Sequence, residues 1–384
     1  MDVEALIRQA DKALGSGDLA VASQLLERAT AERPDDPSLW LRLAALHRGA
    51  GKPQLALNAV RRALEHAPRD FTALLMQASL LEKLGDAGAP QAWEQALANK
   101  PEGELPPQMA SAVAHGERRH AEWIAAREAQ MKSAMAASEA QANAAERKRI
   151  ERFRSNALRQ TRPFHSNPTH FHFPELAERE FHPRSLFPWL DEIEAATDRI
   201  AAELEAVTHA ERAELVPYIQ YAEHLALDQW RTLNKNPDWT AIHLLLRGER
   251  VDANARHCPE TMALLQRLPQ PQVPGASPNA MFSLLAPKTR IPPHVGVSNA
   301  RLVCHLPLVV PEGCWFRVGG ETRLWERGKA FVFDDTIEHE AMNPSDELRV
   351  VFIFDVWHPD LSEVERGAVA ALIGADADSA QPGL

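Results

Sequence analysis

The chain is poor in cysteine and contains no long apolar run. Three of its 384 residues are cysteines, and their spacing is unpaired. This argues against a disulfide scaffold or a zinc ribbon and fits a reducing compartment. No uncharged stretch approaches the roughly 18 apolar residues of a membrane-spanning helix, and the first residues lack the basic and apolar regions of a secretory signal. We therefore expect a cytoplasmic protein without a membrane span.

Positive charge is also in deficit. The chain carries 42 Lys and Arg against 53 Asp and Glu, which gives a formal net charge of −11. Because a surface of this sign repels phosphate backbones, nucleic acid is not expected as a partner. The content of 45% hydrophobic and 25% charged residues is that of an ordinary globular protein. The length is enough for roughly two to three domains.

The first hundred residues repeat. Gly17, Gly51 and Gly85 recur at an interval of 34 residues, each between two stretches of helical apolar periodicity. This pattern resembles the tetratricopeptide repeat and predicts about three copies over residues 1–101. Such arrays present a concave surface, so we expect it to hold a peptide or protein substrate; the alternative is a platform that only packs on its neighbour. The same interval separates Ala22 from Ala56, Ala29 from Ala63, and Pro34 from Pro68.

Residues 102–160 are rich in Ala, Glu, Gln and Arg. These strong helix formers predict one long helix from about Ser111 to Arg154. We interpret the segment as a helical linker, with a coiled coil or a membrane-surface helix as the alternatives. Residues 161–373 are expected to form a single catalytic domain, and residues 374–384 a flexible tail.

From about residue 280 the pattern changes to short apolar runs separated by turn residues. Several short strands at nearly regular spacing predict a β-sandwich or a jelly roll. Trp325 and Trp357 are expected in its core rather than in contact with substrate. The predicted strands cover residues 281–285, 302–306, 331–333 and 349–354.

Two of the 16 histidines stand out by their position. His294 follows two prolines, and His339 follows an apolar strand and a charged turn, which is where a rigid scaffold presents a ligand. Ten residues further on, Arg349 opens a strongly apolar strand. Because an unpaired inward charge is unfavourable, Arg349 should meet an anion. The tract around His165 and His170 has no cysteine or carboxylate at ligand spacing, so a metal is not expected there.

Two neutral imidazoles suit Fe(II), and a nearby arginine suits the carboxylate of a co-substrate. A non-haem iron site normally adds a carboxylate two residues after the first histidine, but this position is Gly296. Three interpretations remain open on the residues alone. The site holds iron with two histidines only, or it takes a carboxylate from Asp334, Asp335 or Glu340, or it holds no metal.

Residues from about 173 to 360 resemble the aspartyl/asparaginyl β-hydroxylase family of Fe(II)/2-oxoglutarate dioxygenases. The resemblance covers about half of the chain, and animal members also carry tetratricopeptide-like repeats before the catalytic domain. Weaker matches lie at residues 187–190 and 248–250. The matching stretches are residues 294–306, 316–319, 325–329, 333–340 and 355–359.

The resemblance implies all-α repeats followed by a distorted double-stranded β-helix, or jelly roll, with flanking helices. It also implies iron held by two histidines alone, with water in place of the carboxylate. His305 could instead be a satisfied core histidine, and Arg301 could pair with a surface acid. Carried over by position, the expected iron ligands are His294 and His339, the 2-oxoglutarate contacts are Ser283, His305 and Arg349, and the substrate contact is Arg301.

The chain departs from the animal enzymes at two places. A basic co-substrate contact two residues before His305 is replaced by Val303. The positions of a bridging cysteine pair fall on Ala255 and Met262, with Cys258 unpaired between them. The second departure agrees with a cytoplasmic enzyme.

Two hypotheses of different class follow. In the first, the protein uses Fe(II), 2-oxoglutarate and molecular oxygen to hydroxylate the β-carbon of Asp or Asn residues in a peptide or protein, or, as an alternative, to hydroxylate a lipid or small molecule. In the second, it is a repeat-based adaptor with an inactive dioxygenase domain. The presence of His294, His339 and Arg349 weighs against the adaptor.

Overall fold

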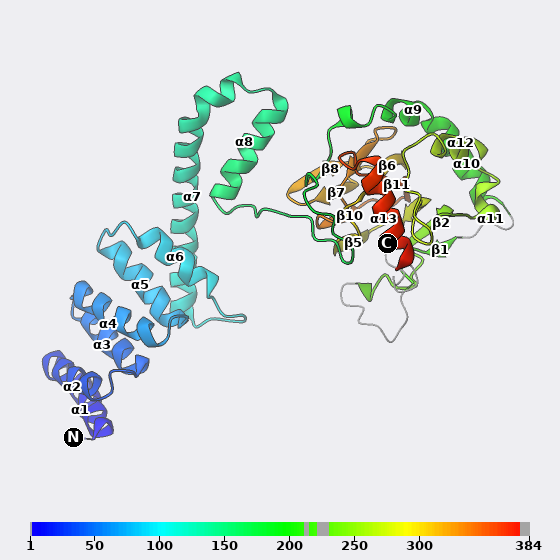
Figure 1. Ribbon diagram of the computed structural model, residues 1–384. Coiled ribbons are helices and arrows are strands. Elements are labelled where there is room, and N and C mark those ends of the chain that lie inside the picture. Colours follow the sequence, from blue (N-terminus) through cyan, green and yellow to red (C-terminus); the bar gives the residue numbers. More distant parts are fainter. Residues whose placement is uncertain (1, 211–214, 221–229, 377–384) are drawn as a thin grey trace. The chain divides into compact units, whose positions relative to one another are not determined.

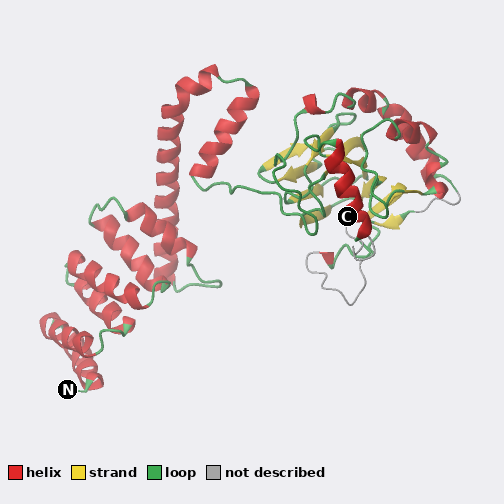
Figure 2. Ribbon diagram, viewed as in Figure 1, coloured by secondary structure: helices red, strands yellow, loops and turns green. Residues whose placement is uncertain are grey.

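The structure is a computed structural model that describes residues 2–210, 215–220 and 230–376 (Figure 1). The chain divides into two compact units, residues 1–160 and 161–384. Figure 2 shows that the first unit is built of helices, whereas the second combines sheets with helices. None of the described helices is long and apolar enough to cross a membrane.

Three helix pairs form the start of the first unit, in agreement with the predicted repeats. Gly17, Gly51 and Gly85 have φ values of 79°, 70° and 66°, the left-handed conformation that glycine adopts most easily, and each lies at the turn within a pair. Ala22 and Ala56 are fully buried, so the paired helices approach closely. The pairs are α1 (Val3–Gly15) with α2 (Leu19–Glu32), α3 (Pro37–Gly49) with α4 (Pro53–His66), and α5 (Phe71–Lys83) with α6 (Ala89–Ala98).

The single long helix predicted for residues 111–154 is wrong. The chain forms α7 (Pro107–Gln141) and α8 (Ala144–Ala157) instead. Ala142 is extended, and Asn143 begins α8 with a capping box in which its side chain and that of Glu146 exchange hydrogen bonds with each other's backbone. Arg154, which is buried, reaches back across the hairpin to Glu139 at 2.7 Å. High helix propensity therefore did not prevent a local cap from dividing the segment.

The start of α7 packs onto the repeats rather than standing apart as a linker. A Cβ at Gly116 would lie 2.4 Å from the ring of Trp93 on α6, so only glycine fits this contact. Glu82 on α5 pairs with His115 at 2.9 Å and with Arg119 at 2.7 Å. Because α7 covers the open side of the last pair, residues 102–160 belong to the first unit.

Two antiparallel sheets form the framework of the second unit. The larger has the order β1-β2-β4-β11-β6-β9 with β3 paired to β2, and the smaller has the order β5-β10-β7-β8. The four predicted strands coincide with β4, β6, β9 and β11. The strands are β1 (Val216–Pro217), β2 (Trp239–Leu246), β3 (Glu249–Arg250), β4 (Ala280–Leu285), β5 (Thr289–His294), β6 (Arg301–Val309), β7 (Trp315–Val318), β8 (Glu321–Leu324), β9 (Phe331–Phe333), β10 (His339–Asn343) and β11 (Arg349–Trp357).

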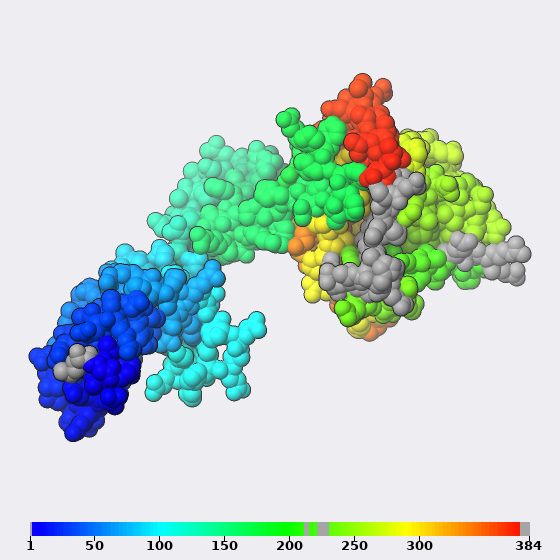
Figure 3. Space-filling view, turned by 60° about the horizontal axis from the view of Figure 1, so that its bottom comes forward, coloured from blue at the N-terminus to red at the C-terminus, as the bar shows by residue number. Residues whose placement is uncertain are grey.

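Helices cover the larger sheet and one edge of the unit. Buried apolar residues of α9, α10 and α12 pack against one face of the larger sheet. Helix α13 lies on the surface beside the segment that contains Phe171 and Phe173 (Figure 3). Gly374 and Ala375 belong to α13 rather than to the predicted tail, while residues 377–384 lie outside the described residues. The elements are η1 (Arg184–Leu186), α9 (Leu190–Ala195), α10 (Thr197–Thr208), α11 (Asp252–Ala255), α12 (Pro259–Leu265) and α13 (Glu363–Ala375).

The alternation of side chains along β11 positions the site. Val350 and Phe352 point into the core beneath the helices. Their neighbours Arg349, Val351 and Ile353 point to the opposite face, toward the smaller sheet. Because β11 pairs with β4 on one side and β6 on the other, this inner face is continued by both neighbouring strands.

Candidate metal and carboxylate site

The two predicted metal ligands lie opposite each other on neighbouring strands. His294 ends β5, His339 begins β10, and the two residues are direct partners in the antiparallel register. Their ring centroids are 4.0 Å apart. Each Nδ1 donates to a carbonyl oxygen of its own chain two residues back, at 2.8 Å for His294 and 3.0 Å for His339. Since a carbonyl can only accept, this fixes the tautomer and leaves each Nε2 with a lone pair for a metal.

Both imidazoles are neutral in this environment. Burial, followed by the proximity of His339, lowers the pKa of His294 well below its usual value. Burial likewise lowers the pKa of His339 to about 4. Neutral imidazole is the form that binds a metal. Among the described residues, no group of three or more His, Cys, Asp or Glu side chains is arranged to hold a metal ion, so these two histidines have no third protein ligand of those types.

Two of the carboxylates considered from the sequence are engaged elsewhere. Asp334 accepts hydrogen bonds from the backbone N–H of Thr336 at 2.9 Å and from its hydroxyl at 2.5 Å. Burial raises the pKa of Asp334 to about 7. Glu340 forms ion pairs with Arg317, at 2.5 Å, and with Arg290. Both carboxylates are therefore already bound by protein groups: Asp334 by Thr336, and Glu340 by two arginines.

Asp335 forms a buried ion pair with Arg301 at 3.0 Å. Burial alone would lower the pKa of Arg301, but the nearby carboxylates outweigh it and the pKa is raised. A Cβ at Gly296 would lie 2.2 Å from Oδ2 of Asp335. The carboxylate of Asp335 thus fills the space that a side chain at position 296 would need. This contact is a steric reason for glycine at that position. The acid that pairs with Arg301 is buried rather than on the surface.

Arg349 is a buried cation that has no anionic partner among the described residues. Its side chain is 1% exposed, and no carboxylate in the described part of the chain forms an ion pair with it. One guanidinium nitrogen donates to the carbonyl oxygen of Ser283 at 3.1 Å and lies 3.4 Å from its hydroxyl, whereas Nε has no partner. Burial lowers the pKa of Arg349 to about 10. An unpaired buried charge is strongly unfavourable, so this group is arranged to receive an anion.

His305 lines the same cavity as the histidine pair and Arg349. It is 6% exposed and surrounded by aromatic rings, with those of Phe316 and Phe333 at 4.9 and 4.8 Å. Its Nδ1 is buried and has no hydrogen-bond partner, so it is not a satisfied core histidine. Burial and then the charge of Arg349 hold its pKa well below the usual value.

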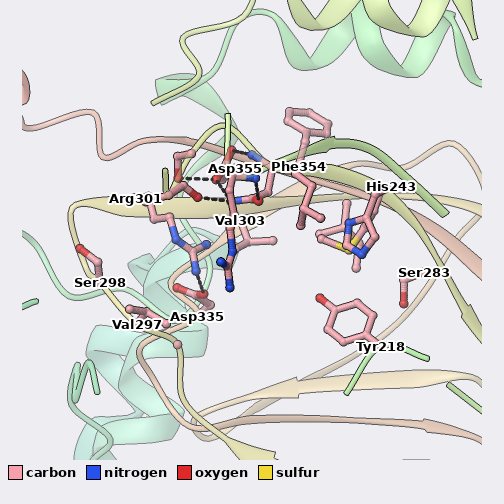
Figure 4. Close-up of a pocket in the computed structure, with 18 of the residues that line it drawn as sticks. Tyr218, His243, Ser283, Val297, Ser298, Arg301, Val303, Asp335, Phe354 and Asp355 are labelled. Carbon is pink, nitrogen blue, oxygen red and sulfur yellow. Dashed lines mark hydrogen bonds and ion pairs between the residues drawn. The ribbon is translucent and has the colours of Figure 1, made fainter. Parts of the chain in front are cut away.

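One cavity of about 510 Å³ joins all six predicted site residues. Figure 4 shows Arg301 and Asp335 on one side of it and Tyr218, His243 and Ser283 on the other. The six residues come from β4, β5, β6, β10 and β11, and none was near all the others in sequence. The structure brings them together, but their individual roles remain predictions.

Sequence reasoning missed several lining residues. Tyr218 and Trp239 stack at 3.9 Å beside the histidine pair, and His243 follows on the same strand. The largely apolar run from Trp239 to Leu246 was the available signal for β2. Trp325 is buried as expected, at 5% exposure, but its ring also lines the cavity.

Comparison with known proteins adds the family of the second unit. Residues 194–359 match the family model described as aspartyl/asparaginyl beta-hydroxylase, and residues 13–81 match a tetratricopeptide-repeat model. The second unit carries an aspartyl/asparaginyl β-hydroxylase domain. This confirms the resemblance read from the sequence, both for the domain and for the repeats before it.

Relatives of the β-hydroxylase domain carry names that refer to different substrates or to the domain alone. The human aspartyl/asparaginyl beta-hydroxylase is 34% identical over 48% of this chain and 24% of its own length. The human aspartate beta-hydroxylase domain-containing protein 2 is 38% identical over 38% and 40%. An ornithine lipid ester-linked acyl 2-hydroxylase from Rhizobium tropici is 34% identical over 49% and 63%. The matched segment thus spans less than two thirds of each relative.

Replacing Gly296 by alanine should destabilise the β-hydroxylase domain. The added Cβ would overlap the carboxylate of Asp335 and force its ion pair with Arg301 to open. We expect a loss of about 1–3 kcal/mol, as for overpacking of a close contact, in urea unfolding of the full chain. Gly367→Ala is the control, because a Cβ there meets nothing within 4 Å. Equal stability of the two variants would contradict the account.

Proposed function

We propose that the protein is an Fe(II)/2-oxoglutarate-dependent dioxygenase that hydroxylates the β-carbon of Asp or Asn residues in a peptide or protein. The observation that carries the proposal is the buried, unpaired Arg349 in the same cavity as two neutral histidines. A metal on the imidazoles and a carboxylate at the guanidinium would satisfy both ends of this cavity. The domain family supports a hydroxylase.

The donor set fits iron. His294 and His339 would hold it through Nε2, and imidazole nitrogen suits Fe(II). Two protein ligands leave coordination positions for the co-substrate, oxygen and water. Bound iron would supply oxygen activation, in which 2-oxoglutarate is oxidised to succinate and CO₂ while one oxygen atom enters a substrate C–H bond. The protein contributes by fixing the two imidazole tautomers and by excluding competing carboxylates.

The same cavity fits 2-oxoglutarate. Arg349 would bind the distal carboxylate by charge-assisted hydrogen bonds, with the hydroxyl of Ser283 beside it. His305, whose Nδ1 has no protein partner, would contact the co-substrate nearer the iron. Binding would then neutralise the buried cation, so the co-substrate should stabilise the folded domain.

The peptide substrate is supported by the named relatives and by the repeats. Arg301 lines the cavity and would bind a substrate carboxylate while sharing its charge with Asp335. The repeats would hold the rest of the polypeptide on their concave surface. Cys258, Cys304 and Cys314 are free and buried, which supports a cytoplasmic location.

A second candidate is hydroxylation of an acyl chain. Val273, Val369 and Ile373 form an apolar part of the cavity wall, which would accommodate hydrocarbon. The Rhizobium tropici relative is named as a lipid acyl hydroxylase. Mass spectrometry for a product 16 Da heavier would distinguish the two candidates, with peptides and lipids of the same cells incubated with the enzyme.

Replacing His339 by alanine should remove iron binding and turnover together. Only two protein ligands hold the metal, so we expect affinity to fall by more than roughly 100-fold, beyond the effect of losing a supporting group. Anaerobic calorimetric titration with Fe(II) measures the affinity, and release of CO₂ from 2-oxoglutarate measures the turnover.

The control is His165→Ala, because His165 is exposed and lies outside the cavity. If His339→Ala binds iron and decarboxylates 2-oxoglutarate as well as this control does, the metal assignment is refuted. Absence of both activities from the parent chain would favour the adaptor hypothesis instead.

Removal of the first unit should separate the two parts of the proposed reaction. Since α7 packs on α6, the deletion must run to residue 160 rather than 101. We expect residues 161–384 to retain 2-oxoglutarate decarboxylation in the absence of substrate but to lose hydroxylation of a polypeptide. If the shortened chain hydroxylates its polypeptide as well as the full chain does, the repeats do not recruit the substrate.

A further inference from the structure

Trp325 presents a hydrogen-bond donor that the fold does not use. The residue lies between β8 and β9 and is 5% exposed. Its indole Nε1 is buried and has no hydrogen-bond acceptor in the described structure. Buried indole N–H groups normally find an acceptor, and leaving one without a partner is unfavourable.

Packing accounts for the ring but not for its N–H. The indole stacks on Phe316 at 5.5 Å with an interplanar angle of 20°, and the guanidinium carbon of Arg349 lies 4.8 Å from the ring centroid. Both contacts use the faces of the aromatic system. A phenylalanine would supply similar faces, so the indole nitrogen is what remains to be explained.

Two other side chains in the wall of the same cavity also carry a donor without an acceptor. Among the described residues, Nε of Arg349 has no hydrogen-bond partner. The hydroxyl oxygen of Ser283 already accepts from Trp239 at 3.1 Å and lies near the guanidinium, so its own proton is available to donate. Trp325, Arg349 and Ser283 all line the cavity. Three donors without an acceptor in the wall of one cavity match the needs of the oxygens of one carboxylate.

We propose that the indole N–H of Trp325 is a further donor to the distal carboxylate of 2-oxoglutarate, beside Arg349 and Ser283. This rests on the proposed function, because it takes 2-oxoglutarate as the co-substrate. Trp325 is then a co-substrate-binding residue whose ring also lies against the guanidinium. A co-substrate with an oxygen acceptor at its distal end satisfies the buried N–H, whereas one with an apolar end does not.

The first test is the affinity of the full chain, loaded with Mn(II), for 2-oxoglutarate by calorimetric titration. Trp325→Phe keeps the aromatic faces and removes the donor, so we expect binding to weaken by roughly ten- to hundredfold, as for loss of a hydrogen bond to a charged group. Trp189→Phe is the matched control, because Trp189 packs on the core at the other face of the larger sheet. Equal affinity of Trp325→Phe and the parent would overturn the proposal.

The second test does not depend on the variant's affinity. In the full chain loaded with Zn(II) and labelled with ¹⁵N-tryptophan, the Nε1–H resonance of Trp325 is assigned with whichever of Trp325→Phe and Trp325→Tyr folds. We expect 2-oxoglutarate to shift this resonance downfield, and 2-oxobutyrate, which lacks the distal carboxylate, to leave it in place. An unshifted resonance in a protein saturated with 2-oxoglutarate would overturn the proposal but not the proposed function. Failure of the parent to bind 2-oxoglutarate at all would overturn both.

Discussion

The buried charge of Arg349 is the constraint around which the interior of the second unit is organised. Removing a guanidinium from water without an anion is unfavourable, and the polar contacts of Arg349 among the described residues are the carbonyl and hydroxyl of Ser283 on the adjacent strand, with the face of Trp325 beside them. His305 stays neutral beside it. A domain that accepts this charge gives up stability in its ligand-free state, which is characteristic of a binding site rather than a core.

Successive side chains of a strand point to opposite faces of the larger sheet, so the same strand contributes to the core and to the cavity. Along β11, even-numbered residues such as Val350 and Phe352 fill the apolar core under the helices, whereas odd-numbered residues such as Arg349 face the cavity. The smaller sheet contributes His294 and His339 as direct partners on two strands. The histidine pair and Arg349 therefore come from two different sheets, each with its own ladder of hydrogen bonds.

The features that could be predicted from the sequence are those that depend on short-range patterns. The glycine interval located the repeats, and the positions of His294 and His339 after turns identified the residues that meet in one cavity. It could not predict the break at Asn143, because a cap overrides the helix propensity of its neighbours. Nor could it predict that Trp325 would lie over Arg349, or that Asp335 would fill the space at Gly296, since both contacts join residues distant in sequence.

The most direct measurement of the central claim is thermal unfolding of the full, Mn(II)-loaded chain with and without 2-oxoglutarate, for the parent and for Arg349→Met. Methionine removes the charge but keeps an unbranched side chain. We predict that the variant melts higher than the ligand-free parent, because an uncompensated buried charge is gone, and that 2-oxoglutarate raises the melting temperature of the parent alone. A variant that melts lower than the parent and is stabilised by 2-oxoglutarate to the same extent would contradict it.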